Sequence, residues 1–240
     1  MTIPSSPSGG VPGNFKDRTE GDEMAEPRDD MPPRVAALSQ DKHGYPVPWF
    51  VAWIDGKPDF RVIGHDAIRT ATMQKRCWIC GMNFDGSEDR AFVIGPMCAV
   101  NRVTAEPPAH RECAVYSATH CPFLITPNMT RRDRHKPAGT KVPPGIMIPR
   151  NPGVALVWIA ADRAWTAERQ PRESGGGVLF RLGEPSECLW FARGRTATRA
   201  EVLESIDSGL PLLRQMAEED GALDELEASH ERALSWVPAP

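Results

Sequence analysis

The 240-residue sequence contains no apolar run of about 18 residues, the length that a membrane-spanning helix needs. Its first residues, MTIPSSPSGGVPGNF, lack the basic start and apolar block of a secretory signal. It also lacks a glycine-rich nucleotide-binding fingerprint. We therefore expect a cytoplasmic protein with no membrane partner, in a compartment that keeps thiols reduced. In that setting, its six cysteines favour a metal site over disulfide bonds.

Lysine is scarce, at six residues against 22 arginines, and the net charge of −4 argues against bulk binding of nucleic acid. The charges are unevenly distributed, however. Residues 100–150 contain eight basic and three acidic side chains, whereas residues 201–240 contain two basic and ten acidic ones. The basic segment should attract phosphate, although a solvated loop has the same composition.

Composition divides the chain into four parts. Residues 1–33 are rich in Pro, Gly, Ser and acids, with too few apolar side chains to offset the entropy of ordering, so we expect disorder. We expect residues 34–125 to combine a β-hairpin with a metal-binding unit and 126–152 to form a basic, proline-rich connector. Residues 153–240 should supply antiparallel strands and C-terminal helices, so the predicted class is α+β.

Hydrophobic periodicity and turn residues predict the individual elements. Strands are predicted at 49–54, 59–63, 91–95, 97–103, 154–160, 178–182 and 187–192, with hairpin turns at DGKP and GEPS. Helices are predicted at 65–76, capped by His65 or Asp66, at 107–120, and in three C-terminal segments separated by Gly209–Pro211 and Gly221. Core packing is the simpler expectation for the tryptophans in predicted strands, and stacking on nucleic-acid bases is the alternative; these are Trp49, Trp53, Trp158 and Trp190.

Two short motifs, CWIC at 77–80 and HREC at 110–113, repeat the same spacing. The first fits a tight turn, and Gly81 after it is free to adopt positive φ. The second falls in the first turn of a predicted helix, where residues three apart point the same way and the amides favour thiolates. Zn²⁺ prefers four such ligands in a tetrahedron. The spacing predicts a structural zinc site formed by Cys77, Cys80, His110 and Cys113, with Cys121 as an alternative to His110.

A knuckle, a hairpin and then a helix with the second ligand pair resemble the treble-clef zinc fold over residues 75–120. The resemblance implies a treble-clef-like zinc unit inserted in or packed on a small antiparallel sheet. Nucleases of the HNH type are built on this fold and use a histidine beside a second metal, usually after an acidic residue. The matching stretch here, FVIGPMCAVN, has neither residue, and its Asn101 cannot act as a general base. In its arginine-rich texture, the chain also resembles small uncharacterised proteins of actinobacteria and their phages, which implies no activity.

These features favour a non-enzymatic, zinc-stabilised binding module that contacts nucleic acid or an acidic protein through residues 102–150. Two alternatives stay open: a degenerate HNH-type, metal-dependent nuclease, and a protein–protein adaptor that uses the acidic C-terminal helices. The candidate nucleic-acid contacts are the basic side chains of the segment, namely Arg102, Arg111, Arg131, Arg132, Arg134, Lys136 and Lys141.

Overall fold

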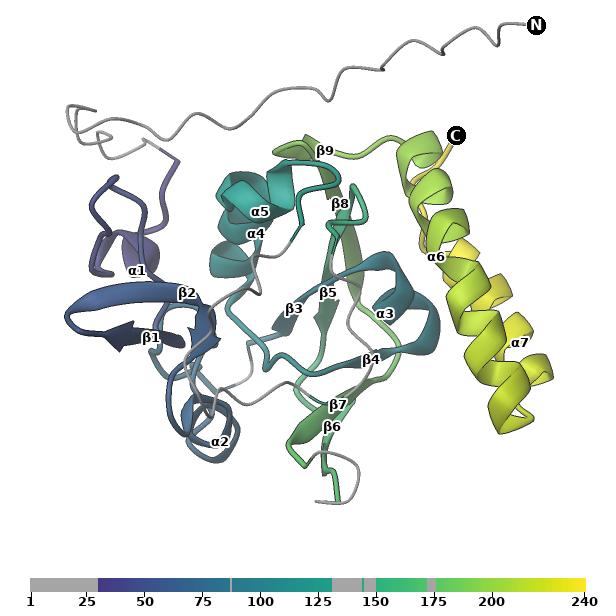
Figure 1. Ribbon diagram of the computed structural model, residues 1–240, viewed down its shortest axis with the longest axis horizontal. Helices are drawn as coiled ribbons and strands as arrows, with labels where there is room; N and C mark the ends of the chain where they lie inside the picture. The colour runs from purple at the N-terminus through teal and green to yellow at the C-terminus, as the bar shows by residue number, and fades with distance from the viewer. Residues whose placement is uncertain (1–29, 87, 131–143, 145–149, 172–175) are drawn as a thin grey trace, which may run out of the picture.

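The structure is a computed structural model that describes residues 30–86, 88–130, 144, 150–171 and 176–240. The helices are α1 (Pro33–Ala36), α2 (Ala67–Met73), α3 (Pro96–Asn101), α4 (Arg111–His120), α5 (Pro122–Ile125), α6 (Arg199–Asp220) and α7 (Leu223–Leu234). The strands are β1 (Val51–Ile54), β2 (Lys57–Ile63), β3 (Arg90–Ile94), β4 (Val103–Thr104), β5 (Ala155–Ala160), β6 (Trp165–Arg169), β7 (Val178–Leu182), β8 (Glu187–Ala192) and β9 (Arg195–Thr196). This is an α+β fold with antiparallel sheets and C-terminal helices, which confirms the predicted class (Figure 1).

The strand β5 is the centre of the molecule. It pairs antiparallel with β3 on one side and with β8 on the other, in a four-stranded sheet of order β3-β5-β8-β9. All six of its residues are buried. Both faces of the sheet are therefore covered, which explains why this strand is a continuous apolar run instead of an alternating one.

The two faces of that sheet support two separate cores. On one face, Leu156 and Trp158 of β5 pack with α3, α6, α7 and strand β7. On the other, Val157 and Ile159 pack with α4, with α1 and with the turn at Cys77–Cys80. Figure 1 shows the same order, with α4 and the C-terminal helices on opposite sides of the strands. The helix α4, which carries one of the two cysteine-containing motifs, is thus anchored directly on the main sheet.

The predicted N-terminal hairpin is confirmed as β1 and β2, which form a two-stranded sheet of their own. Its turn consists of Asp55 and Gly56, both at positive φ, as a tight two-residue hairpin turn requires. Because this hairpin does not join the four-stranded sheet, the unit that carries Cys77, Cys80, His110 and Cys113 is not inserted between strands of one sheet. It packs on the sheet instead and contributes β3 to it.

The predicted strand at 97–103 is wrong. Residues 96–101 form the helix α3, and only the two-residue strand β4 follows. Pro96 suits the first turn of a helix, because no amide hydrogen is needed there. Ala99 and Val100 are buried against the C-terminal helices, so tertiary packing decided the conformation of this short apolar run.

The predicted hairpin across GEPS is also wrong, although both strand ranges are correct. The strand β7 pairs with β4 and β6 in a three-stranded sheet, whereas β8 pairs with β5 and β9. The segment between β7 and β8 carries the chain from one sheet to the other. An apolar pattern indicates a strand and its buried face, but it does not specify the neighbouring strand.

The C-terminal helix α6 runs without a break through Gly209 and Pro211, where the sequence predicts an interruption. Its buried residues on both sides of the proline, including Val202, Ile206 and Ala217, pack into the same core. A β-carbon at Gly209 would overlap the sulfur of Met97, so this glycine permits the close approach of α3. The helix ends at Gly221 in the left-handed conformation, as predicted.

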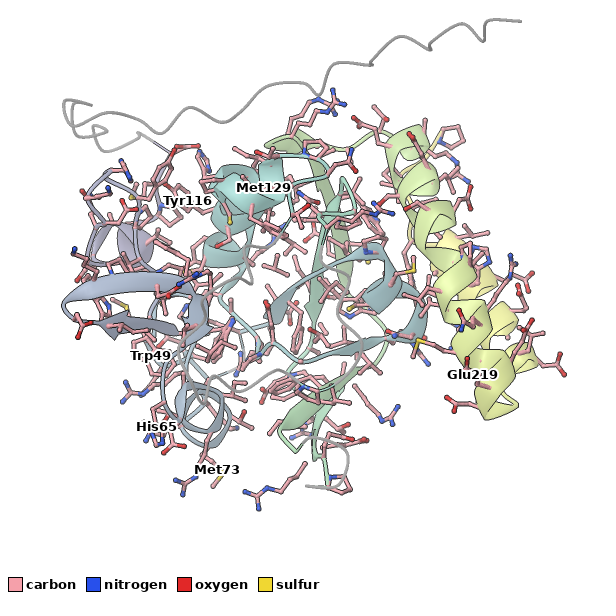
Figure 2. The ribbon with its side chains drawn as sticks, in the orientation of Figure 1. Trp49, His65, Met73, Tyr116, Met129 and Glu219 are labelled. Atoms are coloured by element: carbon pink, nitrogen blue, oxygen red, sulfur yellow. The ribbon has the colours of Figure 1, made fainter. Side chains whose placement is uncertain are left out.

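The start of α2 differs from the prediction. Asp66 occupies the N-cap of α2, but its φ of 57° is left-handed and its side chain makes no capping hydrogen bond, so the predicted cap is wrong. Figure 2 shows that His65 and Met73 point away from the body of the protein around α2.

The expected disorder of 1–33 falls largely on residues 1–29, outside the described part. Among the described residues, none of the helices combines the length and apolar character needed to cross a membrane.

Candidate metal centre

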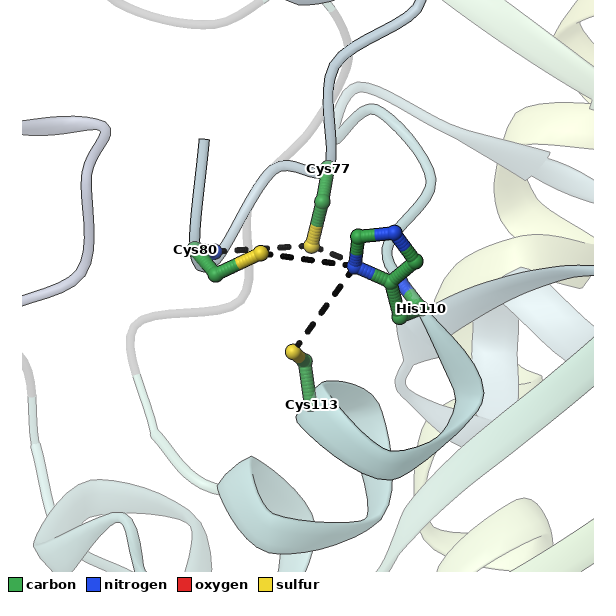
Figure 3. Close-up of side chains that lie close together, drawn as sticks. All are labelled: Cys77, Cys80, His110 and Cys113. Carbon is green, nitrogen blue, oxygen red and sulfur yellow. Dashed lines mark hydrogen bonds between the residues drawn. The ribbon is translucent and has the colours of Figure 1, made fainter. Parts of the chain in front are cut away.

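Cys77, Cys80, His110 and Cys113 converge in one buried group (Figure 3). The Nδ1 atom of His110 lies 3.3 Å from the Cys80 sulfur and 3.9 Å from the Cys113 sulfur. All four donor atoms lie within 4.8 Å of one another. Around a tetrahedral Zn²⁺, with bond lengths of 2.0–2.3 Å, such atoms are separated by about 3.5–3.8 Å. The group therefore has the size and the donor set of a four-coordinate metal site.

The turn of the first pair is fixed by its backbone. The Gly81 amide donates to the Cys77 carbonyl (2.9 Å), and the Cys77 amide donates to the Met82 carbonyl (2.8 Å). Two further amides, those of Cys80 and His110, donate to the Cys77 sulfur at 3.4 Å. Hydrogen bonds of this kind stabilise a thiolate, because they place partial positive charge at the sulfur.

The second pair sits at the start of α4. His110 is the N-cap residue with extended backbone, and Cys113 lies in the first helical turn. The N-terminal amides of a helix carry partial positive charge, which would stabilise a metal-bound thiolate at Cys113. Between the two pairs, the expected hairpin is absent. A single bridge between Ala91 and Ala109 joins β3 to the approach of α4, and α3 and β4 occupy the intervening chain.

Each of the four side chains affects the protonation of the others. Hydrogen bonds from the Cys113 and Cys77 thiols lower the pKa of Cys80 far below its usual value, whereas the nearby Cys77 and Cys80 sulfurs raise that of Cys113. Burial opposes protonation of His110, but hydrogen bonds to Cys77 and Cys80 outweigh it and raise the pKa to about 10. Three sulfurs this close cannot all carry negative charge by themselves. A divalent cation would let all three ionise and His110 release its Nδ1 proton, so these residues fit a metal ion.

A further group of residues surrounds the far side of the His110 ring, and the spacing of the cysteines and histidine does not reveal it. His110 Nε2 lies 3.3 Å from the Asn83 carbonyl oxygen and 3.6 Å from a carboxylate oxygen of Glu88. The Phe84 ring packs against the imidazole, with centroids 4.7 Å apart, and Arg90 lies over Phe84. No spacing rule predicts these contacts. The one signal is Arg90, a charged residue at the head of an otherwise apolar strand.

The remaining cysteines lie outside this group. Cys98 and Cys188 pack against the core on the opposite face of the sheet, where burial raises the pKa of their thiols to about 11 and about 12. Cys121 follows the last residue of α4, eight residues beyond Cys113, which is about 12 Å along a helix. It therefore does not replace His110 in the group.

Two of the seven candidate nucleic-acid contacts lie in the described part of the chain, and both pair with acids. Arg102 lies 3.3 Å from Glu184, and Arg111 lies 2.6 Å from Glu187. The other five, residues 131, 132, 134, 136 and 141, lie outside the described residues. The described part of the chain therefore places only Arg102 and Arg111.

At the place where an HNH nuclease has its histidine, the structure shows Asn101 at the end of α3, with its side-chain oxygen accepting a hydrogen bond from the Val103 amide (3.0 Å). The side-chain amide group of Asn101 thus stabilises a turn.

Of the tryptophans in predicted strands, Trp158 and Trp190 are buried as core residues, whereas Trp53 is 51% exposed.

Comparison of the chain with protein-family models, with curated proteins and with solved structures gives no match.

Proposed function

We propose that this protein is a zinc-stabilised binding module in which Cys77, Cys80, His110 and Cys113 hold a structural Zn²⁺. The observation that supports the proposal is the buried convergence of three sulfurs and one imidazole nitrogen. Three sulfurs and a nitrogen suit Zn²⁺ better than Mg²⁺ or Ca²⁺, which prefer oxygen ligands. Four protein ligands leave no position open for a reactive water, so the proposed role of the metal is structural.

The position of the site supports a role in holding the molecule together. The first ligand pair lies on the turn that follows α2, and the second lies on the helix that covers the β5 face. A bound ion would cross-link these two segments, which are 30 residues apart at their nearest ligands. A turn that carries the first ligand pair and a helix start that carries the second support a treble-clef-like unit as part of this proposal.

Metal content tests the proposal directly. Protein purified without chelator should contain one zinc per chain by elemental analysis, and Co²⁺ substitution should give the absorption of a tetrahedral thiolate site. Removing the metal should lower the melting temperature sharply, since structural zinc contributes on the order of 10 kcal/mol in small zinc domains. Cys80→Ser should lose the metal, whereas Cys188→Ser, which changes a thiol on the other face of the sheet, should retain it. A wild-type chain without stoichiometric metal would contradict the proposal.

The partner that we propose is nucleic acid, contacted through the basic segment 102–150. The support is the excess of basic over acidic side chains in this segment, eight against three. Since Arg102 and Arg111 already pair with acids, we assign most of the contact to residues 131–141. Neutralising phosphates releases counterions, so the affinity should fall steeply with salt.

Mobility-shift titrations with short single-stranded and duplex DNA at several salt concentrations test this partner. Replacing the basic residues at 131, 132, 134, 136 and 141 by Gln should weaken binding and reduce the salt slope by roughly one for each phosphate that is no longer neutralised. A matched control replaces five exposed basic residues elsewhere by Gln, namely Lys57, Arg69, Arg163, Arg169 and Arg193. Equally weakened binding in both variants would mean that only net charge matters. Cleavage of the DNA on addition of Mg²⁺ or Mn²⁺ would instead favour the nuclease.

A further inference from the structure

The far ring nitrogen of His110 has two acceptors. With Nδ1 facing the sulfurs, the ring proton belongs on Nε2, which lies 3.3 Å from the Asn83 carbonyl oxygen and 3.6 Å from Glu88 Oε2. The His110 side chain is fully buried, whereas that of Glu88 is 33% exposed. The direct hydrogen bond goes to Asn83, and Glu88 adds a negative charge beside the same N–H.

Glu88 is held in this place by other residues. Its amide donates to the Asp85 carbonyl (3.0 Å), and its carbonyl accepts from the buried guanidinium of Arg90. Its second carboxylate oxygen lies 3.7 Å from Arg34, the basic residue of α1. The loop that carries Glu88 is therefore restrained at its backbone as well as at its side chain.

Arg34 also connects the two halves of the site. One of its terminal nitrogens lies 3.1 Å from the Asp85 carboxylate, which follows the first ligand pair, and the other lies 2.9 Å from Glu112, between the second pair. The next residue, Val35, is 1% exposed and packs in the same core as Cys77 and Cys113. The helix α1 is thus attached to both ligand-bearing segments.

We propose that Glu88, held by Arg34, is a positioning residue that orients His110 and strengthens it as a metal ligand. The inference rests on the proposed zinc site. A carboxylate near the non-ligating N–H of a histidine fixes the ring orientation and tautomer, and it makes the ligating nitrogen a better donor. Because the imidazole is buried and the carboxylate is only one-third exposed, water screens this interaction less than it would at the surface.

The test measures metal affinity of the full chain by Co²⁺ titration against a competing chelator. Glu88→Gln keeps the size of the side chain and removes its charge, and it should weaken Co²⁺ binding on the order of tenfold. Arg34→Met should weaken binding in the same direction. Glu227→Gln, which breaks an exposed ion pair with Arg214 on the C-terminal helices, is the matched control and should leave the affinity unchanged.

A second readout separates orientation from general loosening. In the metal-saturated protein, the Nε2–H proton of His110 should give a slowly exchanging signal in nitrogen-15 spectra, and Glu88→Gln should accelerate its exchange while the core amides of β5 stay protected. Affinity in Glu88→Gln within twofold of wild type, with unchanged proton exchange, would overturn the inference and leave the zinc site intact. A wild-type chain that takes up no Co²⁺ would instead remove the proposed function and the inference together.

Discussion

At the scale of single residues, the buried cysteine–histidine group depends on a glycine as much as on its own four side chains. Gly81 follows Cys80 at a φ of 73°, in the region that side chains disfavour. A β-carbon at this position would also lie 2.5 Å from the ring of Trp49. The Trp49 amide in turn donates to the carbonyl of Ile79 inside the turn (2.7 Å). Glycine at position 81 therefore meets two requirements: it adopts the positive φ of the turn, and it leaves room for the Trp49 ring.

Gly81→Ala should consequently destabilise the protein more than the backbone conformation alone explains. The left-handed backbone costs about 1–2 kcal/mol for alanine, and overlap with Trp49 adds about 1–3 kcal/mol. Gly56→Ala is the matched control, because Gly56 has nearly the same φ, 74°, and no atom within 4 Å of the added carbon. Urea denaturation of both variants with metal bound should show the difference. Equal free energies of unfolding would contradict the prediction and would mean that the Trp49 ring shifts to accommodate the added β-carbon.

At the scale of elements, α6 has the best-defined helix start in the described chain. The Thr198 side chain accepts from the Glu201 amide, and the Glu201 carboxylate accepts from the Thr198 amide. Arg195 adds an ion pair to Glu201 at 2.7 Å. Hydrogen bonds from Arg195 and from the Thr198 amide together lower the pKa of Glu201 to about 2. Thr198 and Glu201 have the residue types and the spacing of a capping box.

The lowered pKa predicts how Glu201 contributes to stability at different pH values. A carboxyl group with a depressed pKa in the folded state stabilises the fold fully above its ordinary value of 4.5, and this contribution is lost as the pH falls toward 2. Glu201→Gln should therefore be less stable than wild type at pH 7, and the difference should shrink below pH 4.5. Glu204→Gln, an exposed change on the same helix, is the control. Urea denaturation midpoints of wild type and Glu201→Gln from pH 2 to pH 7 test this. A stability difference that stays constant over this range would contradict the prediction.

At the scale of the whole molecule, the sequence indicates where the strands lie but not which strands pair. The ranges of β5, β7 and β8 follow from apolar runs and turn residues, whereas the pairing of β7 with β4 and β6 does not. The same limit applies to α6, where Gly209 and Pro211 predict a break. There the burial of Val202, Ile206 and Ala217 in one core with α3 and the sheet outweighs the missing hydrogen bond of the proline.

The sequence by itself determined the four side chains that gather at the centre, because a turn and a helix start fix the directions of residues three apart. It also determined the α+β class, the doubly buried strand β5 and the cap of α6, since these depend on neighbours along the chain. Only the tertiary structure decided that residues 96–101 are helical, that β7 and β8 belong to different sheets, and that Glu88 lies between His110 and Arg34. These features arise from contacts between residues far apart in the chain, and such contacts leave no local pattern.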